Sequence, residues 1–372
     1  MDLTLFRRDL HRYPECGFNL GRTSARIADV LETAGLEVTR GIGGPGVVAT
    51  LRRGRSGAAI GLRADMDALP ITEANDFAHR SVIEGAFHGC GHDGHSTMLV
   101  GAALRLAEDP ELTRDVHFIF QPDEENGFGA KALIADGLFA RFPMVAIYGM
   151  HNLPGLDVGQ FAIKSGPFCA FEDNFEISVI GKGGHASMPE AGVDAIVVAA
   201  AIVTQLQCIV SRAVSGKSHA VVSVTEFVTD GARNILASNA VLRGDCRGFT
   251  PEVSKKIRSR MEQIVAGVCA AHGAQGAVAY SSSFQPLVND EAATRRAIAA
   301  AGQVGQVDDA YGRVGFSEDF AAYLEHCPGA FVLAGNGTVG SAAMPLHNPN
   351  YDFNDALIET GIAYWVALAK AG

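Results

Sequence analysis

The sequence is poor in positive charge and in long apolar runs. Its 372 residues hold 30 Lys and Arg against 41 Asp and Glu, a net charge of −11, and no run of Lys or Arg exceeds two residues. A nucleic-acid surface normally needs a basic patch, so we expect no nucleic-acid partner. The longest apolar run, 195–203, is far shorter than the roughly 18 residues of a membrane span. We therefore expect no membrane partner.

Cysteine is also scarce, and its pattern excludes a disulfide framework. Seven scattered cysteines, an odd number, are typical of reduced thiols and indicate a cytoplasmic protein. Six of them have no Cys or His neighbours at metal-ligand spacing and are predicted to be small core residues. Hydrophobic residues make up 48% of the chain, enough for a core, and the length predicts about two domains.

The exception is Cys90, which lies in the stretch His-Gly-Cys-Gly-His-Asp-Gly-His at residues 88–95. Thiolate and imidazole are ligands that zinc and similar metals prefer. Cys90 and His92 are two residues apart, so both can face one point, and the glycines allow close backbone approach. The alternative is a polar surface loop with a chance cluster of histidines. We favour a metal-binding loop.

Outside this loop, strand and helix patterns alternate, and the expected helices include 96–107, 130–139 and 318–325. Apolar strands alternating with amphipathic helices predict an α/β fold with a doubly wound, mostly parallel sheet. Three predicted strands in the first 150 residues are 58–62, 116–120 and 144–148. The polar residues that follow them are Asp65 and Asp67, Glu124 and Glu125, and His151. Because such sheets bind ligands at the carboxyl edge of their strands, these groups are expected near the Cys/His loop.

A second domain is predicted from about residue 171 to 286. Its elements follow the order β-α-β-β-α-β, which is the ferredoxin-like arrangement. We interpret it as an insertion, so that residues 1–170 and 287–372 form one discontinuous catalytic domain.

A hydrolytic metal site needs several ligands, an open position for water and a base. The candidate ligands are Cys90, His92, one of Glu124 and Glu125, His151, and His347 in a proline-bounded loop. Five ligands exceed one tetrahedral site, so two metal ions sharing one ligand are expected. One glutamate would bind metal and the other would act as general base. The residues alone leave open which glutamate does which.

Further candidates lie in the predicted insertion. His185 follows two glycines and could donate a hydrogen bond to an oxyanion, although an ordinary turn explains it equally well. Asn234, next to Arg233, and Arg247 could bind a substrate carboxylate. A surface role is the simpler interpretation for the arginines.

Taken together, the sequence resembles the M20 metallopeptidase family, in its amidohydrolase branch of aminoacylases, hippurate hydrolases and auxin-conjugate hydrolases. The resemblance covers essentially the whole chain. It is carried by segments 11–18, 61–70, 88–95, 120–125, 150–152, 181–189, 317–320, 346–348 and 351–354.

The resemblance implies a site with two divalent metal ions per subunit, either zinc or manganese, with cobalt or nickel as alternatives. The implied ligands are Cys90, His92, Glu125, His151 and His347. Glu124 would be the base, and His185, from the same or the partner subunit, would stabilise the tetrahedral intermediate. Asn234 and Arg247 match positions near the substrate carboxylate. The insertion would be a lid and dimerisation domain, giving a homodimer or higher oligomer.

The implied reaction is hydrolysis of an N-acyl amino acid, of N-acetyl or N-benzoyl type, to a carboxylic acid and a free amino acid. Two alternatives remain. One is a dipeptidase or carboxypeptidase of the same family, which would use the same attack by water on a different amide. The other is a catalytically idle metal-binding homologue, against which the intact glutamate pair argues.

Overall fold

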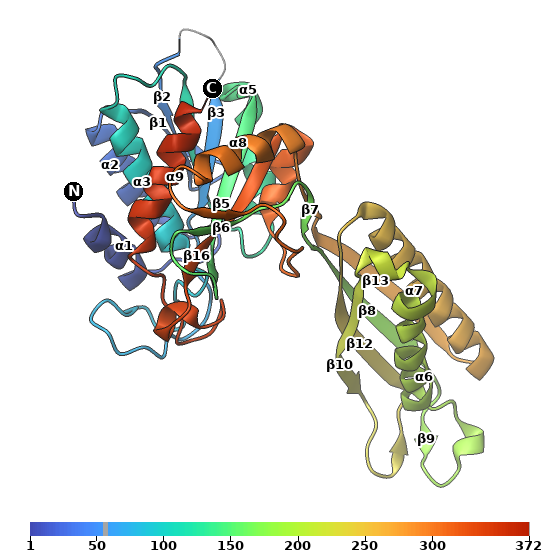
Figure 1. Cartoon of the computed structure of the whole chain (residues 1–372). Helices are drawn as coiled ribbons and strands as arrows, with labels where there is room; N and C mark the ends of the chain where they lie inside the picture. Colours follow the sequence, from blue (N-terminus) through green and yellow to red (C-terminus); the bar gives the residue numbers. More distant parts are fainter. Residues whose placement is uncertain (55–58, 372) are drawn as a thin grey trace. The chain divides into compact units, whose positions relative to one another are not determined.

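The computed structural model describes residues 1–54 and 59–371, which form two compact units (Figure 1). Unit 1 comprises Met1–Phe168, Val288–Gly312 and Asp319–Gly372, and unit 2 comprises Cys169–Leu287 and Arg313–Glu318. These boundaries lie close to the expected ones at 171 and 286. The membership of Arg313–Glu318 in unit 2 had no signal in the sequence.

Unit 1 is built on an eight-stranded sheet with the order β1-β2-β4-β3-β5-β16-β6-β15. Its strands are β1 (Glu37–Ile42), β2 (Gly46–Leu51), β3 (Ile60–Asp65), β4 (Val116–Gln121), β5 (Ala146–Pro154), β6 (Gln160–Ala162), β15 (Gln306–Asp308) and β16 (Gly329–Gly337). Two short strands, β7 (Gly166–Cys169) and β14 (Leu287–Asn289), lie where the chain passes from one unit to the other.

The centre of this sheet is parallel, which confirms the predicted fold class. Strands β4, β3, β5 and β16 pair in parallel, whereas β2 joins β4 and β6 joins β16 in antiparallel fashion. Every residue of β3, β4 and β16 is buried, as expected for strands covered on both faces. Residue 58, where one predicted strand began, lies outside the described residues.

The helices of unit 1 flank the sheet. They are α1 (Leu3–Arg12), α2 (Gly21–Thr33), α3 (His92–Ala107), α4 (Gly129–Ala135), α5 (Leu138–Arg141), α8 (Glu291–Ala301) and α9 (Leu357–Lys370), with 3₁₀ turns η4 (Asp319–Glu325) and η5 (Gly340–Ala343). The predicted helix 130–139 is two helices because Gly137 adopts φ 81° between them. The predicted helix 318–325 is the 3₁₀ turn η4.

Helix α3 begins one turn earlier than the expected residue 96. Gly91 precedes it with φ 90°, a conformation that favours glycine, and Asp93 lies in the first turn, where a carboxylate stabilises the helix N-terminus. Thirteen of its sixteen residues are buried, so it is a core helix. His92 is therefore fixed on the first helical turn, rather than on a flexible loop.

Unit 2 has the predicted ferredoxin-like topology. The elements are β8 (Phe171–Ile180), β9 (Gly184–His185), η1 (Pro189–Ala191), α6 (Ala195–Cys208), η2 (Ile209–Ala213), η3 (Gly216–Ser218), β10 (Val221–Thr229), β11 (Ile235–Leu236), β12 (Asn239–Gly248), α7 (Pro251–His272) and β13 (Gln275–Phe284). Four strands form an antiparallel sheet in the order β10-β12-β8-β13. Burial alternates along β8, so one face packs on α6 and α7 and the other stays polar.

One segment of unit 2, Ala195–Ala213, is long and apolar enough to cross a membrane, with a mean hydropathy of 1.7. The uninterrupted apolar run 195–203 is the first part of this segment, and polar residues such as Thr204 and Gln205 interrupt the rest. Val198, Ile202 and Leu206 are spaced along one side of the helix and are buried in the core of unit 2. This packing accounts for the apolar character of that side.

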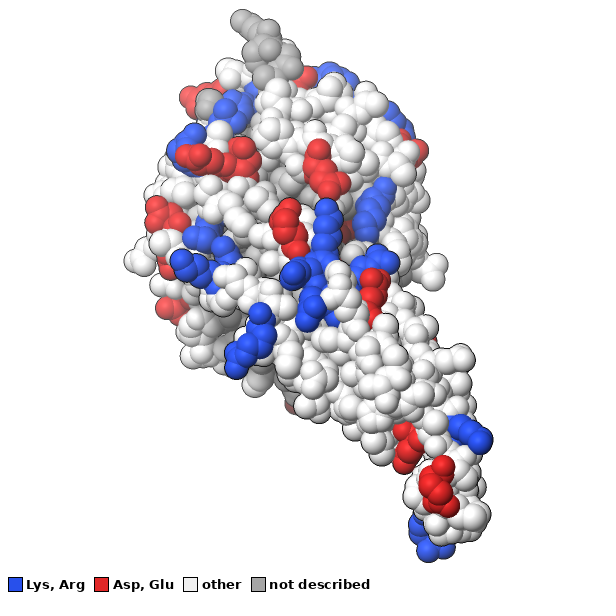
Figure 2. Space-filling model, turned by 90° about the vertical axis from the view of Figure 1, so that its right-hand side faces the viewer, with Lys and Arg blue, Asp and Glu red and all other residues white. Residues whose placement is uncertain are grey.

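Charged side chains of both signs are interspersed on the face of the molecule drawn in Figure 2. Several surface arginines are paired with acidic residues. Arg40 lies 2.7 Å from Asp29 and 2.8 Å from Glu32, and Arg105 lies 2.8 Å from Glu359. Such exposed pairs contribute little to stability.

Candidate metal centre

Four segments of unit 1 bring the predicted ligands together at the carboxyl edge of the sheet. Glu124 and Glu125 follow β4, and His151 lies within β5. Cys90 and His92 stand at the start of α3. His347 arrives from the loop after η5, and its φ of 67° bends the backbone there.

Among the described residues, five groups have ligand atoms that all lie within 4.8 Å of one another, and three of the five consist only of the predicted ligands and Glu124. These three clusters are Cys90, His92 and His151; Cys90, Glu125 and His347; and His92, Glu124 and Glu125. Cys90 Sγ lies 3.3 Å from His151 Nε2, and Glu125 Oε2 lies 3.5 Å from His347 Nε2. Cys90, His92 and Glu125 each belong to two of these clusters, so the three clusters are joined through shared residues.

Unsatisfied polar atoms show that a cation fits this cluster. Among the described residues, neither ring nitrogen of His92 has a hydrogen-bond partner, nor does Glu125 Oε1, although all three atoms are buried. Leaving a buried polar group unpaired costs about 1–3 kcal/mol. The donor set of one thiol, imidazoles and a carboxylate suits zinc and other first-row divalent metals.

The shifted pKa values in the cluster also favour a bound cation. Burial raises the pKa of Cys90 well above its usual range, and the carboxylates of Glu125 and Glu124 raise it further. Burial also raises the pKa of Glu125 to about 7. Burial acts to lower the pKa of His92, but Asp65 and Asp67 outweigh it and raise that pKa to about 10. These groups retain protons that a divalent cation would displace.

Further side chains hold the ligands in place. His151 Nδ1 lies 2.7 Å from the carbonyl oxygen of Asn152, which leaves Nε2 directed at Cys90. The carboxylate of Asp67 accepts the backbone N–H groups of Glu124 and Glu125 at 3.1 and 3.2 Å. Asp67 thereby fixes the loop that carries the glutamate pair.

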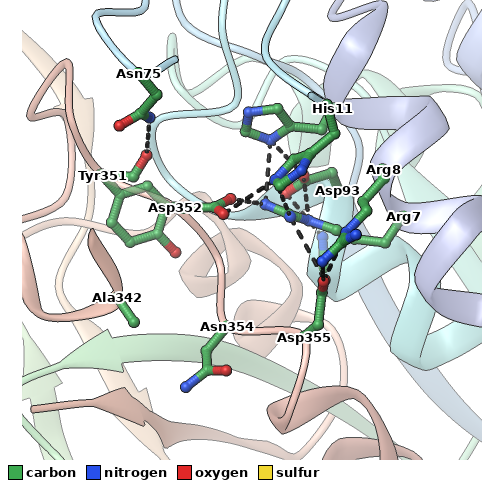
Figure 3. Close-up of polar contacts among 12 residues, drawn as sticks. Arg7, Arg8, His11, Asn75, Asp93, Ala342, Tyr351, Asp352, Asn354 and Asp355 are labelled. Atoms are coloured by element: carbon green, nitrogen blue, oxygen red, sulfur yellow. Dashed lines mark hydrogen bonds and ion pairs between the residues drawn. The ribbon is translucent and has the colours of Figure 1, made fainter. Parts of the chain in front are cut away.

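A buried charge network surrounds Asp93, the residue that follows His92 in the chain (Figure 3). Asp93 Oδ2 is 2.8 Å from both Arg7 Nε and His11 Nδ1, and all three side chains are fully buried. Arg7 also pairs with Asp352, and His11 Nε2 lies 3.1 Å from Glu73 Oε1. The network ties α1 to the first turn of α3 and to the loop before α9. His88, to which we assign no role, is buried nearby.

The remaining predicted site residues belong to unit 2. His185 lies in β9, paired with Ile235, and the carbonyl oxygen of Asn234 accepts the N–H of Ala186 at 3.1 Å. Arg247 lies near the C-terminal end of β12, whereas His185 and Asn234 lie near β11, which precedes the N-terminal end of β12. The guanidinium group of Arg247 contacts Glu172 at 2.7 Å, Asp245 at 2.6 Å and Ser317 at 2.6 Å. Within unit 2, Arg247 is therefore far from the His185 and Asn234 pair.

Sequence reasoning assigned no role to several residues that shape the site. Asp65 and Asp67 lie at a strand end in the sequence, but their partners lie in distant segments. The burial of Arg7 could be inferred from its position in the sequence, because it lies with Phe6, Leu10 and His11 on the buried side of α1. A charged residue within a buried helical stripe indicates a buried partner.

Comparison with known proteins identifies the family of the chain. Peptidase family M20/M25/M40 matches residues 61–371. The chain is 35% identical over 369 residues to an N-acetylcysteine deacetylase of Bacillus subtilis, covering 98% of this chain and 94% of that protein. It is 36% identical over 369 residues to a hippurate hydrolase of Campylobacter jejuni, with the same coverage.

A solved structure from Bacillus subtilis, described as a dinuclear metal-binding peptidase of the M20 family, superposes with a TM-score of 0.86. It is 32% identical and covers 99% of this chain and 96% of its own. The two-unit fold, the candidate metal centre and these relatives agree. The chain is a hydrolase that belongs to peptidase family M20 and, within it, to the amidohydrolase branch.

Proposed function

We propose that this protein hydrolyses the amide bond of N-acyl amino acids of the N-acetyl or N-benzoyl type. The observation that carries the proposal is the convergence of Cys90, His92, Glu125, His151 and His347 beside Glu124. The substrate class is supported by the relatives, a deacetylase and a hippurate hydrolase that match nearly the whole chain.

Cys90, His92, Glu125, His151 and His347 would hold two divalent metal ions, zinc or manganese, with cobalt or nickel as alternatives. Bound there, such ions would acidify a water molecule and polarise the scissile carbonyl. The assignment of Glu125 as the ligand is supported by its oxygens, which lie 3.8 Å from His92 Nε2 and 3.5 Å from His347 Nε2.

Glu124 would act as general base and then as general acid. Its carboxylate would take a proton from the attacking water while the oxygen bonds to the carbonyl carbon. It would return that proton to the amide nitrogen as the C–N bond breaks, which releases a carboxylic acid and a free amino acid. Its low exposure, 6%, would keep bulk water from competing for the proton.

His185 would stabilise the oxyanion of the tetrahedral intermediate, from the same or the partner subunit. Ser187 N–H donates to His185 Nδ1 at 3.2 Å, so this nitrogen is an acceptor and the proton resides on Nε2. The exposed ring therefore presents a donor, as an oxyanion requires. Asn234, whose loop lies beside His185, would bind the substrate carboxylate. For Arg247, the same role would require exchange of its present carboxylate partners.

We also propose a homodimer formed through unit 2, and a cytoplasmic location. Strand β10 lies at an edge of its sheet and exposes Val221, Phe227 and Val228, and α6 exposes Ile196 and Val197. An unpaired edge beside apolar side chains is suited to pairing with a second copy. All seven cysteines are free, in keeping with a reducing compartment.

The test is a panel of N-acetyl and N-benzoyl amino acids, assayed after chelation and refilling with each metal in turn. Dipeptides with a free amino terminus form the second arm, because the solved relative is described as a peptidase. Turnover of acyl amino acids that Glu124→Gln lowers by at least about 100-fold supports the proposal. Faster cleavage of dipeptides would reassign the substrate class, and full activity in Glu124→Gln would refute the mechanism.

A further inference from the structure

Asp319, the first residue of η4, contacts the proposed base through its backbone. Its N–H group donates to Glu124 Oε1 at 3.4 Å, and both residues are buried. We propose that Asp319 is a positioning residue for Glu124. The inference rests on the proposed function, since it assigns a role in the same reaction.

The contact restricts a torsion of the Glu124 side chain. The terminal torsion of a glutamate is broad, so each contact to its carboxylate narrows the orientations that it samples. Holding one oxygen limits the directions in which Glu124 can accept a proton. The distance is at the long end for a hydrogen bond, and such contacts tighten when substrate binds.

The side chain of Asp319 is itself held from three elements. Gln121 Nε2, at the end of β4, donates to both carboxylate oxygens at 2.8 Å. The N–H of Ala130, in the first turn of α4, donates to Oδ2 at 2.9 Å. Arg63 Nη2, from β3, pairs with Oδ1 at 2.9 Å. These four contacts fix the backbone of residue 319, and with it the direction of its N–H group.

Arg63 adds an ion pair to the contacts that hold the Asp319 side chain. It is fully buried, and its other terminal nitrogen pairs with Asp65 Oδ2 at 2.7 Å. Arg63 Nε and the hydroxyl of Tyr323 both donate to Gln121 Oε1, at 2.8 and 2.9 Å. Gln121 is thereby oriented with its amide nitrogen toward Asp319. A neutral residue at 319 would leave the charge of Arg63 only partly compensated.

The test compares Asp319→Asn with the wild-type protein. An asparagine has the same size, but its NH₂ group would face the donors of Gln121 or Ala130. We expect kcat to fall about 10- to 100-fold, with KM and bound metal within about twofold of wild type. Asp173→Asn is the matched control, because Asp173 is also buried and accepts from Ser254 and Tyr280 in unit 2. We expect it to lower stability and leave kcat unchanged.

Three results would overturn the proposal: unchanged kcat in Asp319→Asn, a loss of metal that parallels the loss of kcat, or an equal loss in Asp173→Asn. If Asp319→Asn does not fold, Tyr323→Phe removes only one hydroxyl from the network. It should lower kcat about threefold at constant KM. An unchanged kcat there also counts against the proposal.

A wild-type protein inactive on every acyl amino acid would refute the proposed function instead. Crystal structures then test the positioning directly. The carboxylate of Glu124 should lose its contact with the N–H of residue 319 in Asp319→Asn, or in Tyr323→Phe if only that variant folds. A retained contact would overturn the inference.

Discussion

Replacing Arg7 by methionine should destabilise unit 1 far more than replacing a surface arginine. Arg7 is fully buried and pairs with Asp93 at 2.8 Å, with Asp352, and with Asp355 at 3.5 Å. Methionine keeps much of the apolar stem and removes the charge. Asp93 would then remain buried without its cationic partner.

The structure sets the size of the effect. Removing one partner of a buried ion pair costs about 3–5 kcal/mol. Asp93 keeps His11 at 2.8 Å and the N–H of Gly94 at 2.9 Å, so we expect about 3 kcal/mol, the lower end of that range. Arg105→Met is the control. Arg105 makes two hydrogen bonds to Glu359, but both side chains are substantially exposed, and we expect at most about 0.5 kcal/mol.

The assay is urea unfolding of the metal-free protein, followed by fluorescence of Trp365. This residue is the only tryptophan, is buried, and lies in unit 1, so its signal reports that unit alone. Metal-free protein removes the contribution of ligand binding to the measured free energy. A cost below about 1 kcal/mol for Arg7→Met, or one equal to that of Arg105→Met, would refute the reasoning.

Three further predictions concern single positions. Burial lowers the pKa of His117, so below about pH 6.5 the unfolded chain binds a proton that the folded chain excludes. The stability advantage of wild type over His117→Gln should therefore shrink as pH falls from 7.5 to 5.5, and parallel pH profiles from urea unfolding would contradict this. Cys90→Asp should shift metal preference from zinc toward manganese in competition dialysis, because carboxylate is a harder ligand than thiolate; an unchanged preference would argue against direct ligation. Gly91→Ala should lower metal affinity at least tenfold by titration calorimetry, because Gly91 has φ 90° and an added Cβ would lie 2.7 Å from the hydroxyl of Tyr351; wild-type affinity would show that the loop tolerates the change.

The parts of the fold that follow local patterns were predictable from sequence. The alternation of apolar and polar residues around Phe175, Ile177 and Val179 in β8, and the short apolar runs of the central strands, are visible in the sequence and identified both sheets. Most elements appeared within a few residues of their expected positions. The exceptions have local causes, such as Gly91 and Gly137, whose positive φ values shift a helix start and divide a helix.

The candidate ligands were predictable for a different reason. Each follows a strand or lies in a motif with few structural uses, and the sheet edge brings them together. Their supporting contacts were not predictable, because these join residues far apart in sequence. Arg63 meets a partner 256 positions away, and Arg7 meets Asp352 across 345. No local pattern encodes such pairs, and only the completed fold selects them.

The division of the chain also determines how the protein can be cut and recombined. The backbone passes between the units four times, because Arg313–Glu318 returns to unit 2. A gene fragment for residues 169–287 would omit that return segment, in which Val314 bridges to Cys169 and the carbonyl oxygen of Val314 accepts the N–H of Ala170. No single proteolytic cut releases unit 2 alone. An exchange of this unit between relatives must therefore carry both segments, and hybrids joined at two points will lack part of the domain they import.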